Sequence, residues 1–171
     1  EAMQVELRQL CTRLGLTAIL VTHDQEEALT LADRIAVMRA ARLEQVADAR
    51  TIYDRPASRF VAEFLGNSNF LPARVEGVEG DGIVRLRDAK GRVLTATSEI
   101  PRHNGADLLL VIRAEKLRLV RGEPAAGAVN TVTGTVAQVV FKGHQVEVYL
   151  KMPETGTLVA YARIGEDLAT L

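Results

Sequence analysis

The spacing of apolar residues changes near residue 67, and this change divides the chain into two regions with different folds. In the first region an apolar stripe recurs at helical spacing at Met3, Leu7, Leu10 and Leu14. In the second region apolar residues alternate with polar ones, as in residues 83–88 and 146–151. A period of 3.6 residues buries one face of a helix, and a period of two buries one face of a strand. The pattern predicts an α/β region over residues 1–66 and an all-β region over residues 67–171.

Within residues 1–66, short apolar runs and helical patterns alternate. The first helix should end at Gly15, and the continuous apolar run Thr17–Val21 predicts a strand covered on both faces. A helix over about Asp24–Ala32 and a strand over Arg34–Met38 would complete a βαβ unit. Two further short helices are expected between residues 47 and 66, separated near Pro56 because proline lacks the amide proton of a helix interior.

Within residues 67–171, turn signals separate the alternating segments at 79–82, 89–91, 142–144 and 153–156. Their close spacing predicts consecutive hairpins. A small closed or nearly closed β-barrel is the economical arrangement, because closing a sheet removes its exposed edges. The polar residues Asn67–Asn69, followed by Phe70, are expected to form a plain linker or a hinge between the two regions.

Composition excludes several classes of protein. Lys and Arg number 21 against 22 Asp and Glu, interspersed along the chain, so nucleic acid is not an expected partner. The single cysteine, Cys11, excludes an internal disulfide and fits a reducing compartment. No apolar run approaches the roughly 20 residues that span a bilayer, so another chain would have to bring this one to a membrane.

His23 is the candidate site residue, because it follows the predicted strand directly. The carboxyl end of a parallel strand is where α/β proteins usually bind ligands. Two capping patterns, Thr22 with Gln25 and Asp24 with Glu27, predict that a helix starts just after it. His23 would then lie in the turn, where an imidazole can donate to a phosphate oxygen or position a water. The alternative is a turn histidine without a task.

No metal site is expected from the sequence. Glu26 and Glu27 are favoured in a first helical turn by the helix dipole and need no further role. His103 and His144 lie in predicted turns without a second ligand at a recognisable spacing.

Four segments together resemble one protein family: VTHDQEEALTLADRIAVM at 21–38, RLEQV at 42–46, TIYDRPASRFVAEFLG at 51–66 and NFLPARV at 69–75. They are similar to the ATPase subunits of ABC importers, in the branch that serves maltose, sulfate, ferric iron and polyamines. In that family the histidine of VTHD, here His23, contacts the γ-phosphate of ATP and the attacking water. The resemblance implies that residues 1–66 are the C-terminal piece of a P-loop nucleotide-binding domain. It also implies that residues 67–171 are the regulatory TOBE domain, an OB-like barrel.

Departures from the family pattern occur at single positions. VIRAEKLRLV, at 111–120, resembles the family's arginine-proline-glutamate segment, with Ala114 in the proline position. Ala41 and Ala47 stand where the family favours glycine, and Arg50 where it favours proline. The turn geometry at these positions is therefore open.

The resemblance implies a set of cofactors and partners for the intact protein. ATP and Mg²⁺ would be its cofactors. Its partners would be an identical subunit in a homodimer, the transmembrane permease subunits and an extracytoplasmic solute-binding protein, on the cytoplasmic side of the plasma membrane. The join NFLPARV is most like polyamine and iron systems.

The sequence contains no phosphate-binding loop of the form G-x-x-x-x-G-K-[ST], no LSGGQ-type signature and no apolar strand ending in Asp-Glu. Phosphoryl transfer depends on positioning by those parts, so this chain alone is expected neither to hold ATP tightly nor to hydrolyse it. The alternative reading is a free-standing module that binds a small ligand or oxyanion, since related barrels in the molybdate branch of the family bind that anion.

Overall fold

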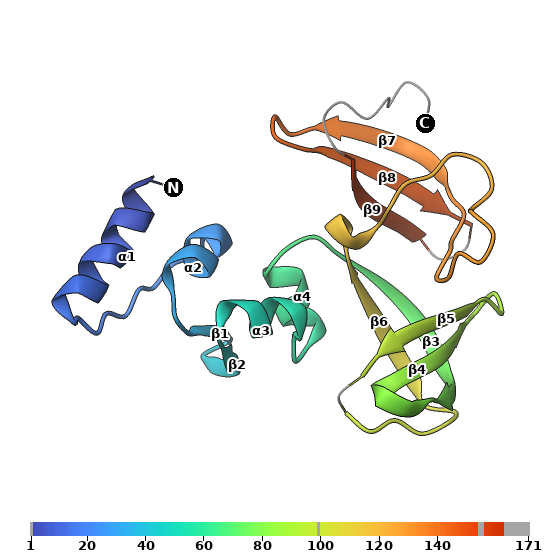
Figure 1. Cartoon of the computed structure of the whole chain (residues 1–171), viewed down its shortest axis with the longest axis horizontal. Helices are drawn as coiled ribbons and strands as arrows, with labels where there is room; N and C mark the ends of the chain where they lie inside the picture. Colours follow the sequence, from blue (N-terminus) through green and yellow to red (C-terminus); the bar gives the residue numbers. More distant parts are fainter. Residues whose placement is uncertain (1, 99, 154–155, 163–171) are drawn as a thin grey trace. The chain divides into compact units, whose positions relative to one another are not determined.

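The computed structural model describes residues 2–98, 100–153 and 156–162, and the chain divides into two compact units, residues 1–67 and 68–171 (Figure 1). The first unit contains helices α1 (Ala2–Leu14), α2 (Gln25–Leu31), α3 (Ala49–Asp54) and α4 (Arg59–Phe64) and strands β1 (Ile35–Arg39) and β2 (Arg42–Ala47). The predicted first helix is confirmed, and Gly15 follows it with a φ of 64°, in the left-handed region that glycine adopts without strain.

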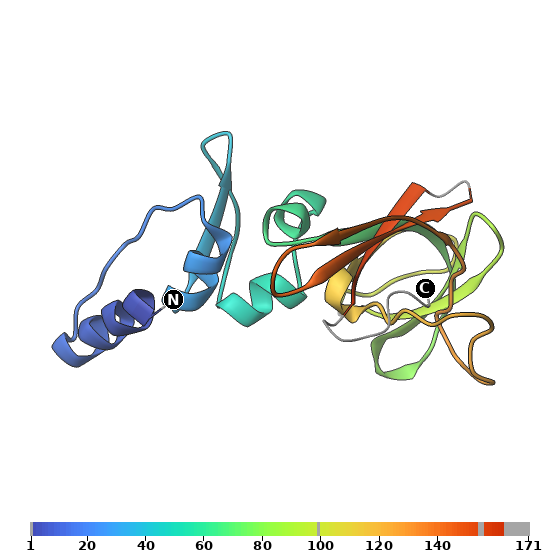
Figure 2. The same cartoon turned by 90° about the horizontal axis from the view of Figure 1, so that it is seen from above.

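The predicted βαβ unit is wrong for this chain. Residues 17–21 belong to no strand or helix, and Ile19 and Val21 are 92% and 93% exposed. β1 pairs antiparallel with β2 in a two-stranded hairpin, which Figure 2 shows as a narrow ribbon. A parallel strand needs a neighbour to accept its backbone hydrogen bonds, and the described residues offer residues 17–21 none.

A small core holds β1, α3 and α4 together. Its buried residues are Ile35, Val37, Ile52, Val61 and Leu65. The two short helices form on either side of Pro56, as predicted. The Gln45 side chain spans that break, because its Nε2 donates to Arg55 O at 2.9 Å and its Oε1 accepts from Ala57 N–H at 2.7 Å.

Two alanines close the β1–β2 hairpin in a conformation that alanine disfavours. Ala40 and Ala41 have φ values of 46° and 59°, and they lie between the paired residues Arg39 and Arg42. Positive φ at both central residues is the signature of a type I′ turn, where asparagine and glycine are preferred. The hairpin therefore forms despite the departure from glycine at position 41, at the cost of local strain.

We predict that Ala41→Gly stabilises the hairpin by about 0.5–1 kcal/mol, because glycine adopts positive φ without a Cβ clash. Amide hydrogen exchange of β1 and β2 is the measurement. Ala36→Gly, in the exposed middle of β1, is the matched control and should weaken the same amides. Equal loss of protection in both variants would contradict the strain at Ala41.

The second unit is all β. Its strands are β3 (Ser68–Val78), β4 (Ile83–Asp88), β5 (Val93–Thr97), β6 (Asp107–Arg113), β7 (Thr135–Phe141), β8 (Val146–Met152) and β9 (Gly156–Ala162), with single 3₁₀ turns at Gly80–Gly82 and Ala114–Lys116. The described strands form two antiparallel sheets, in the orders β5-β4-β3-β6 and β7-β8-β9. The expected closed or nearly closed barrel is therefore confirmed in part: the described strands enclose one core, but as two sheets and not as one continuous sheet.

Three of the four predicted turns join paired neighbours: 79–82 joins β3 to β4, 89–91 joins β4 to β5, and 142–144 joins β7 to β8. The fourth, 153–156, lies partly outside the described residues. The linker expected at 67–70 is wrong from Ser68 onward, because Ser68, Asn69 and Phe70 pair with Arg113, Ile112 and Val111 of β6.

The two sheets of this unit share a core, and a buried asparagine links them. Apolar residues of β3, β4 and β5 pack with Met152 and Leu158 from the other sheet. Asn69, 4% exposed, connects β3 to β9: its Nδ2 donates to Val159 O at 2.8 Å, and its Oδ1 accepts from Val159 N–H at 2.7 Å. The amide thus acts on Val159 as a neighbouring strand would.

We predict that Asn69→Ala destabilises the second unit by about 1–3 kcal/mol for each Val159 backbone group left buried without a partner. Chemical denaturation is the measurement. Asn104→Ala, in the exposed loop before β6, is the control and should change the free energy of unfolding by less than about 0.5 kcal/mol. If both variants unfold at the same denaturant concentration, the amide link is not structural.

Candidate functional site

His23 lies exposed in a bend that leads into α2. Two hydrogen bonds shape this bend: Asp24 N–H donates to Thr22 Oγ1 at 2.9 Å, and Glu27 N–H donates to Asp24 Oδ1 at 3.0 Å. Asp24 is therefore the N-cap of α2, as one of the two capping patterns predicted. Because its neighbours satisfy the helix start, the His23 side chain is left open to solvent.

Several apolar residues of the first unit are left exposed. Leu16, Ile19, Leu20 and Val21 are all more than half exposed, and so are Met3 and Leu14 of the predicted α1 stripe. α1 is held to the end of α2 by Arg8, which donates to Thr30 O and to Asp33 Oδ1, each at 3.0 Å. So many exposed apolar residues within the first 21 positions are unusual on an isolated protein and are typical of a segment that contacts another surface.

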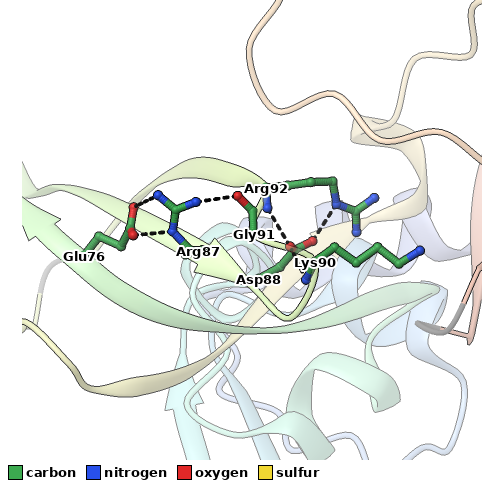
Figure 3. A network of polar contacts seen from close by, with 6 residues as sticks. All are labelled: Glu76, Arg87, Asp88, Lys90, Gly91 and Arg92. Carbon is green, nitrogen blue, oxygen red and sulfur yellow. Dashed lines mark hydrogen bonds and ion pairs between the residues drawn. The ribbon is translucent and has the colours of Figure 1, made fainter.

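A cluster of polar side chains lies at the β4–β5 turn, where the sequence predicted only a turn (Figure 3). Asp88 is 6% exposed, and its Oδ1 accepts from Lys90 N–H and Arg92 N–H, each at 2.9 Å. Its Oδ2 accepts from Arg92 Nε at 2.6 Å. An aspartate that precedes a Lys-Gly turn is a known signal for such side-chain-to-backbone bonds, so the sequence contained a clue to this arrangement.

Two ion pairs border a groove on one side of this turn. The groove, of about 450 Å³, is lined by β3, β4 and β6 residues that include Arg74, Glu76, Arg87 and Asp107. Arg87 binds Glu76 through Nε and Nη2 and donates from Nη1 to Gly91 O at 2.6 Å, as Figure 3 shows. Arg74 Nε donates to Asp107 Oδ1 at 2.8 Å. Because each arginine faces a carboxylate, the rim is charge-neutral.

On the other side of the turn is a smaller pocket of about 320 Å³. Its lining is cationic and hydroxylic: Lys90, Arg92, Thr131, Thr133, Gly134, Thr135 and Pro153. Asn130 holds the segment that carries the threonines against β5, because its Oδ1 accepts from Thr95 N–H at 2.7 Å and its Nδ2 donates to Thr95 O at 2.9 Å. Sequence analysis identified none of these residues, because the pocket forms between segments about 40 residues apart.

The surroundings of Asp88 lower the pKa of its carboxyl group. Burial opposes ionisation, but the hydrogen bonds from the Arg92 side chain and from the Arg92 and Lys90 N–H groups outweigh it. A carboxyl group whose pKa is lower in the folded state stabilises the fold above its unfolded pKa of about 3.9, and the stabilisation is lost as the pH falls through the folded value.

We predict that Asp88→Asn lowers the free energy of unfolding at pH 7 by about 1–3 kcal/mol, because the asparagine oxygen no longer pairs a charge with Arg92. The variant should also lose less stability than the native chain between pH 5 and pH 2. Denaturant titrations across that range are the measurement. Asp107→Asn, which removes the exposed partner of Arg74, should have a much smaller effect because solvent screens that pair. Parallel pH profiles for native and Asp88→Asn chains would contradict the role of this carboxylate.

Within the described residues, no helix is long and apolar enough to cross a membrane. The same residues contain no group of three or more His, Cys, Asp or Glu side chains arranged to hold a metal ion. Glu26 and Glu27 belong to α2 of the first unit, while His103 and His144 are exposed in loops of the second unit.

Comparison with known proteins assigns relatives to both units. Residues 110–169 match the TOBE domain family. A spermidine/putrescine import ATP-binding protein of Rubrobacter xylanophilus is 45% identical over 171 residues, covering 99% of this chain and 44% of its own length. The protein of the same name from Ruegeria pomeroyi is 40% identical and covers 98% of this chain and 44% of its own length. The chain therefore spans less than half the length of the curated relatives it matches.

One solved structure is also similar in part. It is that of a cytoplasmic molybdate-binding protein, with a TM-score of 0.47 and 20% identity over 59% of this chain and 79% of its own. A likeness of this size assigns no ligand to the present chain.

Proposed function

Because the chain belongs with the ATP-binding subunits of ABC importers, whose C-terminal part it matches, we propose that it acts as the C-terminal part of the ATP-hydrolysing subunit of a polyamine importer. The observation that carries this proposal is the 45% identity that continues through both units. A free-standing barrel that binds a small ligand would not need the first 67 residues to match such subunits. The alternative reading is therefore less well supported.

In this proposal His23 contacts the γ-phosphate of ATP and the attacking water in the intact subunit. Its exposed side chain and the bend held by Thr22 and Asp24 support the role, because they leave the imidazole pre-positioned beside the start of a helix. An imidazole in such a place can donate a hydrogen bond to a phosphate oxygen and orient a water for in-line attack. ATP and Mg²⁺ would be held by parts of the intact subunit that have no counterpart in this sequence.

The first unit would then be the C-terminal piece of a nucleotide-binding domain. The relatives contain further sequence outside the matched region, and we propose that such sequence covers α1 and residues 16–21. Burying each exposed Leu, Ile or Val side chain would contribute about 1.5–3 kcal/mol. Strand neighbours in the same sequence would accept the hydrogen bonds that residues 17–21 lack here, and would restore the predicted parallel strand.

The proposed partners follow from the same assignment. The intact subunit would pair with an identical subunit and bind transmembrane permease subunits at the cytoplasmic face of the plasma membrane. An extracytoplasmic solute-binding protein would deliver the polyamine, in keeping with the names of the spermidine/putrescine import relatives. The residues 68–171 would serve as the regulatory domain of that assembly.

We predict that His23→Ala in the intact subunit reduces ATP hydrolysis at least about a hundredfold while leaving ATP affinity within about threefold, because the residue acts on the γ-phosphate and water in the transition state. Steady-state hydrolysis and nucleotide titration on the assembled importer are the measurements. His103→Ala, in an exposed loop of the second unit, is the matched control and should hydrolyse ATP at the native rate.

If the His23→Ala subunit hydrolyses ATP at the native rate, His23 has no catalytic role and is only a turn residue. The importer assignment has its own test, in which radiolabelled spermidine uptake by the reconstituted importer should depend on ATP. Failure of uptake with intact ATP hydrolysis would overturn the polyamine assignment alone. The 171-residue chain by itself is expected to hydrolyse no ATP.

A further inference from the structure

The pocket beside the β4–β5 turn has walls that are held from both sides. Asn130, with a φ of 56°, fixes one wall through its paired hydrogen bonds to Thr95. At Gly134 on the same wall, a Cβ atom would come within 2.8 Å of Met152 Sδ and 3.2 Å of Lys151 O. A side chain at position 134 would require Met152 and β8 to shift, so Gly134 lets this wall pack closely against β8. The opposite wall is the turn that Asp88 ties together.

The charges in this pocket are not balanced. Asp88 neutralises Arg92 through Nε, but Arg92 Nη2 is buried and has no hydrogen-bond partner among the described residues. Among the residues that the structure describes, Lys90 forms no ion pair. Figure 3 shows its side chain extending to the same side of the turn as that of Arg92. The neighbouring groove, whose arginines are paired with carboxylates, offers no such excess charge.

Hydroxyl groups complete the donor set. Thr131, Thr133 and Thr135 line the pocket, and a hydroxyl can donate to an oxyanion without adding charge. Arg92 also lines the pocket, so its guanidinium group contributes positive charge to an anion bound there. Guanidinium, ammonium and hydroxyl donors gathered around about 320 Å³ suit a tetrahedral oxyanion, because such an anion accepts hydrogen bonds in several directions.

We propose that this pocket, between the β4–β5 turn and the segment 131–135, binds a phosphate-class oxyanion through Lys90, Arg92 and the threonine hydroxyls. The ligand is either inorganic phosphate or the phosphate group of a larger molecule such as a lipid headgroup. The site lies within the second unit and does not depend on His23 or on ATP hydrolysis. It would let the proposed regulatory domain respond to an anion that is separate from the transported polyamine.

The first test is calorimetric titration of the full 171-residue chain with inorganic phosphate. We expect saturable one-site binding that weakens as ionic strength rises. Lys90→Met and Arg92→Lys should each weaken binding about tenfold, because each removes one charge-assisted contact. Lys116→Met and Arg118→Lys, at exposed positions outside the lining, are the matched controls and should bind as the native chain does.

Lys90→Met keeps the proposal testable if Arg92→Lys disturbs the turn, because only the backbone N–H of Lys90 bonds to Asp88. Thermal melts of each variant identify such a disturbance. No binding by a folded native chain, or equal binding by native and Lys90→Met chains, overturns the proposal.

Two further arms identify the source of the anion. Flotation with phosphatidylcholine vesicles, with and without phosphatidic acid, detects binding to a lipid headgroup. Binding that occurs only with the acidic vesicles, and that Lys90→Met abolishes, supports the site with a lipid ligand.

Glu154 follows Pro153 in the sequence and lies outside the described residues. Phosphate binding that appears only in Glu154→Gln would overturn the proposal, because it would show that a carboxylate of the chain already occupies the pocket.

Discussion

The second unit depends on one buried amide. Asn69 lies on β3, yet it bonds both backbone groups of Val159, which is 90 residues away on β9. The apolar contact between the two sheets specifies direction poorly because the hydrophobic effect is non-directional, whereas this hydrogen-bonded link is directional. The paired donor and acceptor define which residue of β9 faces which residue of β3. This polar contact therefore helps to set the register in which the two sheets enclose their shared core.

The same device recurs at two other places. Asn130 pairs with Thr95 at the edge of β5, and Gln45 spans the break between α3 and α4. In each case a side-chain amide hydrogen-bonds one backbone N–H and one backbone C=O that have no partner in a helix or a sheet. Buried or partly covered backbone groups must find such partners, so these amides allow irregular segments to lie against the fold. The Asn130 link matters for function, because it positions the threonine wall of the proposed anion pocket.

Charge divides the surface around the β4–β5 turn into two kinds of site. Along the groove, arginines of β3 and β4 form ion pairs with carboxylates, so their positive charge is neutralised by groups of the protein itself. At the pocket, Asp88 pairs with Arg92, and among the described residues Lys90 forms no ion pair and Arg92 Nη2 has no hydrogen-bond partner. The distinction comes from geometry rather than composition, since the whole chain is almost neutral. Exposed apolar residues of α1 and of residues 16–21 mark the first unit in a different way, as a contact surface, which agrees with the proposed place of this unit in a larger domain.

Local signals in the sequence determined the helices α1 to α4, the division of the chain near residue 67 and three hairpin turns, because capping residues, proline breaks and hydrophobic period act over a few residues. Those signals also predicted a strand at Thr17–Val21, and here the tertiary structure decided otherwise, since a buried strand needs neighbours that the described residues do not provide. Asn69 was interpreted as part of a linker, although its partner Val159 is far away in the sequence. His23 was found from its place between an apolar run and a helix cap, and its role stays a prediction. Lys90, Arg92 and Thr133 line one pocket only because of the fold. Strand pairing and the hydrogen bonds of Asn130 bring together segments that are far apart in the sequence, and no local pattern predicts that they meet.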